Sequence, residues 1–142
     1  MKNLEEYKDL IYRIIGSAMS VHRELGGGLL EPIYNEALHY ELLDRGIENE
    51  SEKNVECYYK NHKLEKHYRV DIVVGDIIVE LKAAQDIIPE FRYQLFNYMR
   101  LTKCCYGLLL NFGPYSLYGE RYFYDQETNE CRLLDSSLKP MK

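Results

Sequence analysis

Apolar residues recur every three or four positions along the first 25 residues of the chain, which is the period of a helix with one buried side. They are Leu4, Tyr7, Leu10, Ile11, Ile14, Ile15, Ala18, Val21 and Leu25. We therefore predict a helix over Leu4–Leu25 that ends at the glycines 26–28. A second stripe predicts a helix over Glu31–Asp44, with Pro32 in its first turn and Gly46 just beyond its end.

Beyond residue 54 the pattern changes to the two-residue alternation that is typical of strands. The expected elements are strands at Val55–Tyr59, His67–Val74 and Ile77–Leu81, a turn at Lys60–Lys63, a helix at Glu90–Leu101, a buried strand at Cys104–Phe112 and a hairpin within Gly119–Leu134. This order predicts an α/β fold in which helices flank a central mixed β-sheet. The length of 142 residues fits a single domain over residues 1–142.

Three charged residues interrupt the most strand-like segment, "YRVDIVVGDIIVELKAAQ". The Gly75–Asp76 pair between two β-branched runs predicts a two-residue hairpin turn. That register places Asp71 opposite Glu80, with Cβ atoms about 5 Å apart, and puts Lys82 on the same face. Facing carboxylates repel each other, and Mg²⁺ relieves the repulsion because it takes oxygen ligands. The alternative is a charge ladder on a solvated sheet face, in which Lys82 balances the two acids.

Composition and charge narrow the choice of function. The net charge of −5 argues against a protein that coats polyanions, but not against an enzyme that meets phosphates through a metal ion. No apolar run approaches the roughly 20 residues that span a bilayer, so we expect no membrane association and a cytoplasmic location. Four cysteines without a C-x-x-C pair predict reduced thiols. A zinc site of Cys57, His62 and His67 matches no common ligand spacing.

The hairpin with its charged residues resembles the acidic motif of the PD-(D/E)XK nuclease superfamily. Asp71 is followed by the hairpin and then by Glu80-Leu81-Lys82, although Val70 stands where the strict motif has proline. This resemblance implies a restriction-endonuclease-like fold with an αβββαβ core, which agrees with the order predicted above. It also implies a metal-dependent nuclease that hydrolyses phosphodiester bonds of nucleic acid, with DNA the expected partner.

Two further segments extend the resemblance. "GLLEPIY" supplies Gly28, Glu31 and Tyr34 and resembles the signature of the GxxExxY family, small bacterial proteins assigned to that superfamily. Similar context covers about Leu10–Gly113. "QLFNY" supplies Gln94 and Tyr98 on the expected third helix and resembles the Q-x-x-x-Y motif of exonuclease-type members.

The resemblance assigns a role to each of the matching residues. Asp71 and Glu80 would bind Mg²⁺ or Mn²⁺ together with the carbonyl of Leu81, and Lys82 would orient or activate the attacking water. Glu31 would reach the site from its helix and assist the metal. The substrate-facing residues would be Gln94 and Tyr98, which line the site and contact the substrate backbone.

Other interpretations of these residues stay open at this point. The helix macrodipole by itself favours a carboxylate at Glu31, Tyr34 fits an apolar stripe, and Gln94 and Tyr98 fit an ordinary surface pair. At the level of function, the alternatives are a catalytically silent nucleic-acid- or protein-binding module that retains the fold, and a phosphoesterase acting on a small nucleotide. A homodimer is also conceivable if Tyr118–Tyr124 forms an edge strand that can pair.

Overall fold

The structure is a computed structural model that describes residues 2–141. Its helices are α1 (Leu4–Leu25), α2 (Glu31–Asp44) and α3 (Pro89–Thr102). Its strands are β1 (Glu50–Tyr59), β2 (His62–Val74), β3 (Ile77–Lys82), β4 (Tyr106–Asn111), β5 (Tyr118–Asp125) and β6 (Glu130–Leu134). The fold is therefore a mixed sheet with flanking helices, and the α/β prediction is confirmed.

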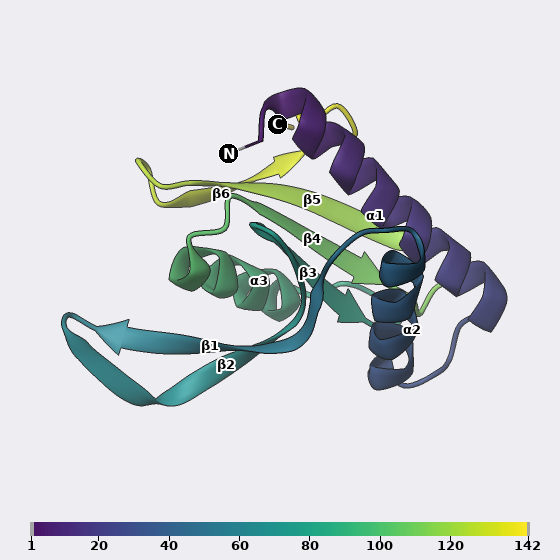
Figure 1. Ribbon diagram of the computed structural model, residues 1–142, viewed down its shortest axis with the longest axis horizontal. Helices are drawn as coiled ribbons and strands as arrows, with labels where there is room; N and C mark the ends of the chain where they lie inside the picture. Colours follow the sequence, from purple (N-terminus) through teal and green to yellow (C-terminus); the bar gives the residue numbers. More distant parts are fainter. Residues whose placement is uncertain (1, 142) are drawn as a thin grey trace.

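The six strands form one sheet in the order β1-β2-β3-β4-β5-β6. Neighbouring strands are antiparallel except β3 and β4, which run parallel because α3 connects them as a crossover. One core cluster joins the sheet to α1 and α2, and a second joins it to α3. In Figure 1 the sheet accordingly lies between the α1–α2 pair and α3, and the β1–β2 hairpin extends away from the body as an arm.

The helix boundaries agree closely with the sequence patterns. Both predicted N-terminal helices have the predicted ends, and α3 is one residue longer at each end. Gly26 caps α1 with φ 74° and Gly46 follows α2 with φ 76°, a left-handed conformation that glycine adopts without strain. The local signals that begin and end helices were therefore sufficient here.

Two strand predictions need correction. β1 and β2 begin five residues before the predicted Val55–Tyr59 and His67–Val74. The added residues are mostly polar and exposed, so they show no alternation. Tyr118–Tyr124 is not an edge strand, since β5 pairs with β4 on one side and β6 on the other. The edges of the sheet are β1 and β6, which removes the argument for dimerisation through β5.

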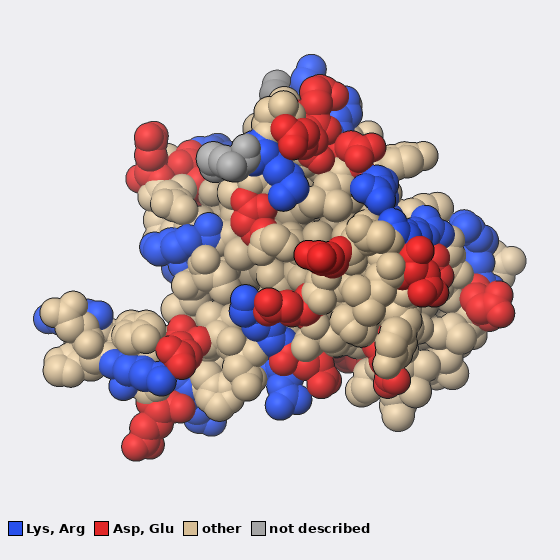
Figure 2. All heavy atoms as spheres, in the orientation of Figure 1, with Lys and Arg blue, Asp and Glu red and all other residues tan. Residues whose placement is uncertain are grey.

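The surface carries charges of both signs. Acidic and basic side chains are interspersed over the face drawn in Figure 2, so neither sign dominates that face. None of the helices described is both long and apolar enough to cross a membrane.

Candidate active site

The site begins where β2 and β3 part. Their backbones pair at three positions, from Val74↔Ile77 to Ile72↔Val79. At the next position, side chains replace the backbone ladder. The N–H of Asp71 donates to Glu80 Oε1 at 3.1 Å, and the N–H of Leu81 donates to Asp71 Oδ2 at 2.8 Å. Each carboxylate thus binds the backbone of the opposite strand at the fork.

The alternation of β2 also breaks at this point. Ile72 packs with α1 and α2, whereas Val70, two residues earlier, packs in the cluster with α3. On β1, Glu52 lies between the partners of these two residues and has φ 53°, a left-handed conformation that is rare for a non-glycine residue. The chain therefore twists around Asp71, where β2 leaves β3 and continues with β1.

Burial strongly affects the acidic pair. Glu80 is only 3% exposed, so the alternative of a solvated charge ladder does not describe it. Burial raises the pKa of Glu80 well above its usual value, and the negative charge of Asp71 raises it further. Burial also raises the pKa of Asp71, although the hydrogen bond from the Leu81 N–H opposes this. Without a cation, the pair therefore favours holding a proton.

Lys82 lies two residues beyond Glu80 on β3. Its Nζ donates to Gln94 Oε1 at 3.0 Å and lies 4.5 Å from the centre of the Phe91 ring. Both contacts come from α3, so that helix fixes the direction of the lysine. The positive charge of Lys82 partly opposes the rise in the pKa of Asp71 and of Glu80. The ammonium group therefore lies within electrostatic range of the pair.

Tyr98 lies one helical turn after Gln94 on α3 and is 4% exposed. Burial raises its pKa to about 12, with further contributions from the charges of Glu80 and Asp71. Its ring meets Tyr68 of β2 edge-on, with the centroids 5.3 Å apart. The interpretation of Gln94 and Tyr98 as an ordinary surface pair is therefore wrong, because one binds Lys82 and the other is buried beside the acids.

Glu31 opens α2 on the other side of the sheet from α3. Its side chain stays exposed, yet partial burial raises its pKa, Lys82 lowers it and Asp71 raises it. Glu31 therefore lies within electrostatic range of Lys82 and Asp71. The loop before Glu31 is held by Tyr34, whose hydroxyl donates to the Gly26 carbonyl at 2.6 Å and accepts from the Leu29 N–H at 3.1 Å.

The spacing of "GLLEPIY" thus has a structural explanation. Tyr34 is fully buried and stacks on Phe112 just after β4, with the ring centroids 4.6 Å apart. From there its hydroxyl ties down the glycine loop that precedes Glu31. The core interpretation of Tyr34 is correct, and its effect is to position the start of α2. His22 is likewise a packing residue, since its Nε2 lies 3.1 Å from the Phe112 carbonyl oxygen.

The residues present fit a divalent cation of the magnesium type. Between residues 2 and 141, no three His, Cys, Asp or Glu side chains gather as a metal cluster. Mg²⁺ commonly uses only one or two protein carboxylates and keeps several waters. Half-buried Asp71 and buried Glu80 supply two carboxylates that disfavour the doubly charged state, and a cation removes that conflict.

Sequence analysis missed the residue that holds the segment after Lys82 in place. Asn111 ends β4, and its side chain accepts from the Ala84 N–H at 3.0 Å and donates to the Ala84 carbonyl at 2.9 Å. It also accepts from the Gly113 N–H at 3.0 Å. These bonds hold the segment after Lys82 against β4. The available signal was a single amide within the apolar run "GLLLNF".

Comparisons with known proteins agree with this geometry. Residues 8–121 match the family model described as PD-(D/E)XK nuclease superfamily. Among curated protein sequences, none matches the chain significantly. The solved structure described as the crystal structure of SSO0001 is 18% identical in sequence, with a TM-score of 0.50. That similarity covers 68% of this chain and 52% of SSO0001, so the chain matches about half of that protein, and it shows a shared fold.

Proposed function

The chain belongs to the PD-(D/E)XK nuclease superfamily, and on that premise we propose that it hydrolyses phosphodiester bonds of nucleic acid, DNA foremost, with Mg²⁺ or Mn²⁺. One observation carries the proposal. Half-buried Asp71 and buried Glu80 form an acidic pair at the strand fork, and Lys82 follows Glu80 on the same strand. Burial and the charge of Asp71 raise the pKa of Glu80, and shifts of this kind concentrate at functional sites.

Asp71 and Glu80 would hold the cation together with the Leu81 carbonyl, because all three are oxygen ligands on adjacent positions of the fork. When bound, the cation would polarise the phosphodiester and lower the pKa of a coordinated water. The protein's own task is then to aim the attacking water. Lys82 suits that task because Gln94 and Phe91 hold its ammonium group near the pair.

Glu31, Gln94 and Tyr98 would complete the site. Glu31 would approach it from α2 and assist the metal through a bound water. Gln94 would orient Lys82 and contact the substrate backbone, and Tyr98 would close the buried side. The hydrogen bonds of Tyr34 to the glycine loop before Glu31 support membership of the GxxExxY family, since they connect the tyrosine of the signature to the segment that leads into its glutamate.

The test uses purified protein with single- and double-stranded DNA and RNA, in Mg²⁺, Mn²⁺ or EDTA. Lys82→Ala should reduce metal-dependent cleavage by about 100-fold or more, while its thermal unfolding stays close to that of the wild type. Lys8→Ala, on α1 across the sheet, is the matched control and should cleave normally. Absence of cleavage by the wild type under all these conditions would reject the proposal and favour a silent binding module.

A further inference from the structure

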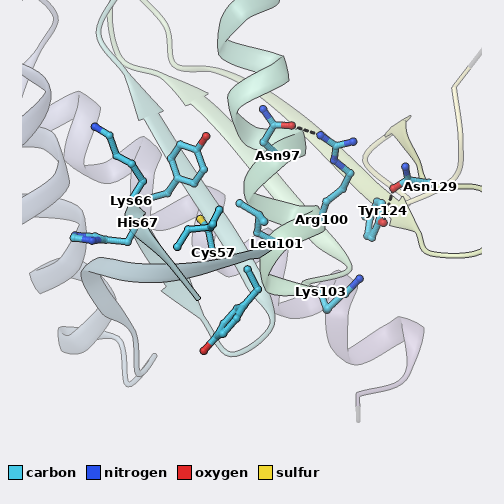
Figure 3. A pocket seen from close by; sticks show the side chains of 12 residues that line it. Cys57, Lys66, His67, Asn97, Arg100, Leu101, Lys103, Tyr124 and Asn129 are labelled. Atoms are coloured by element: carbon cyan, nitrogen blue, oxygen red, sulfur yellow. Dashed lines mark hydrogen bonds between the residues drawn. The ribbon is translucent and has the colours of Figure 1, made fainter. Parts of the chain in front are cut away.

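A large cavity lies beside the candidate active site, next to the Tyr68–Tyr98 contact. It is a cavity of about 920 Å³ between the β1–β2 arm, the C-terminal half of α3 and the β5–β6 hairpin. Figure 3 shows Lys66 and His67 of β2 on one side and Asn97 and Arg100 of α3 on the other. We call it the arm pocket. None of the roles assigned above uses it.

The lining of the arm pocket has a distinct charge. It includes Lys66, Arg100 and Lys103, and none of its lining residues is Asp or Glu. The whole chain carries a net charge of −5, so a pocket with cations alone is unlike the rest of the protein. Arg100 and Lys103 also suit the C-terminal end of α3, where the helix dipole is negative. That effect does not account for Lys66, which comes from β2.

Aromatic side chains stand among these cations. Tyr58 and Tyr68 line the pocket and are 56% and 45% exposed, and Tyr124 lines it with its hydroxyl donating to Asn129 Oδ1 at 2.7 Å. Exposed aromatic faces beside Lys and Arg are the elements that bind unpaired nucleic acid, because bases stack on the rings while phosphates meet the cations. A duplex would hide the faces of its bases from such rings.

Two structural elements connect the arm pocket to the acidic pair. On β2, Tyr68 precedes Asp71 by three residues, a distance of about 10 Å, and its ring touches Tyr98. On α3, Gln94, Asn97 and Leu101 follow at intervals of three and four, so they form one stripe of about 10 Å. That stripe begins at the contact with Lys82 and ends in the pocket.

We propose that the arm pocket binds an unpaired segment of the nucleic-acid strand whose phosphodiester lies at Asp71 and Glu80. The inference rests on the proposed function and specifies its substrate as single-stranded, or as a duplex with an unpaired end. The cations would hold phosphates, and Tyr58 and Tyr68 would stack on bases. No carboxylate lines the pocket, so nothing in it would attract a basic peptide. For the same reason the pocket is unsuited to a metal ion.

The test measures binding in EDTA, where no cleavage occurs, with labelled single-stranded DNA and RNA and their duplexes. The wild type should bind single strands more tightly than duplexes. Arg100→Gln/Lys103→Gln should weaken single-strand binding about tenfold and flatten the slope of log K against log salt by about 0.7 for each lost phosphate contact. Tyr68→Leu should weaken it about tenfold with the salt slope unchanged.

The control is Lys8→Gln/Arg23→Gln, which removes the same charge from α1 on the opposite side of the sheet and should leave binding unchanged. Thermal unfolding checks that each variant folds. Wild-type preference for duplexes, no binding of single strands, or equal loss in the control would overturn the inference. Cleavage in Mg²⁺ separates the two proposals. If the wild type cleaves and the pocket variants bind normally, the role of the pocket is rejected and the proposed hydrolysis stands. If the pocket variants lose binding but the wild type does not cleave, the proposed hydrolysis is rejected and the role of the pocket stands.

Discussion

Two buried glutamates on this sheet are 3% and 6% exposed, yet their surroundings differ completely. Glu120 of β5 accepts two hydrogen bonds from Arg92, at 2.8 and 2.7 Å, and one each from Tyr118 and Tyr122. Burial opposes its ionisation, but the bonds from Arg92 and the tyrosines outweigh it and lower the pKa to about 2. Glu80 instead faces Asp71, and its pKa is raised.

The comparison teaches how to separate a structural from a functional buried acid. Glu120 carries its own counter-charge and two phenolic donors, so it is complete within the protein and joins α3 to β5. The pair of Glu80 and Asp71 accepts hydrogen bonds from backbone N–H groups, but burial and the charge of Asp71 still raise the pKa of Glu80. Such a pair becomes favourable only when something positive binds it.

Removing the charge of Glu80, the acid with a functional role, should have the largest effect, and the effect should be on cleavage. Glu80→Gln keeps the size of the side chain but removes the charge that would bind a metal. We expect metal-dependent cleavage to fall by about 100-fold or more, with equal or higher stability in EDTA because the repulsion with Asp71 is gone. Cleavage assays and thermal unfolding measure the two effects. A stable Glu80→Gln variant with normal cleavage would contradict the assignment.

Removing Glu120, the acid with a structural role, should lower stability and leave cleavage nearly unchanged. Glu120→Ala leaves Arg92, Tyr118 and Tyr122 without their shared acceptor. We expect a loss of about 2 kcal/mol in the free energy of unfolding, reduced from the value for a fully buried pair because Arg92 is partly exposed. Denaturant unfolding measures the loss. Below the melting temperature, cleavage by this variant should stay within about threefold of the wild type, since the acidic pair is untouched.

The pH dependence of stability in EDTA sharpens the contrast with a smaller effect. Glu120 has a lowered folded pKa, so its stabilisation is present above its ordinary pKa of 4.5 and is lost as the pH falls toward about 2. Glu80 has a raised folded pKa, so the folded state binds the extra proton, and stability decreases as the pH rises from the ordinary pKa of 4.5 through the raised folded pKa. Unfolding curves at several pH values should show that Glu80→Gln removes the second trend and Glu120→Gln the first.

Much of the fold followed from local patterns. The stripe from Leu4 to Leu25 and the Gly75–Asp76 turn were sufficient to place α1 and the β2–β3 hairpin, including the register Ile72↔Val79. The full length of the β1–β2 arm could not be predicted from local patterns. Its residues are mostly exposed, and the alternation of polar and apolar residues disappears where a strand has no buried face. β5 was misplaced at the edge because pairing partners are set by strand order in space.

Part of the candidate site could also be predicted from local patterns. Asp71, Glu80 and Lys82 are close in the hairpin, so turn geometry alone brings them together. Gln94 and Glu31 come from separate helices, and only packing could show that one binds Lys82 and that the other lies within reach of its charge. Asn111 was overlooked because its partner, Ala84, is 27 residues away in the chain.

By itself, the sequence determined the helices, the central hairpin and the facing position of Asp71 and Glu80, because periodicity and turn chemistry act between near neighbours. The tertiary structure decided that Glu80 is buried and that Glu120 is satisfied by Arg92. It also decided that the β1–β2 arm and α3 enclose a cationic pocket beside the acids. Burial and counter-charge depend on which distant segments pack together, and that arrangement sets the chemistry of each carboxylate.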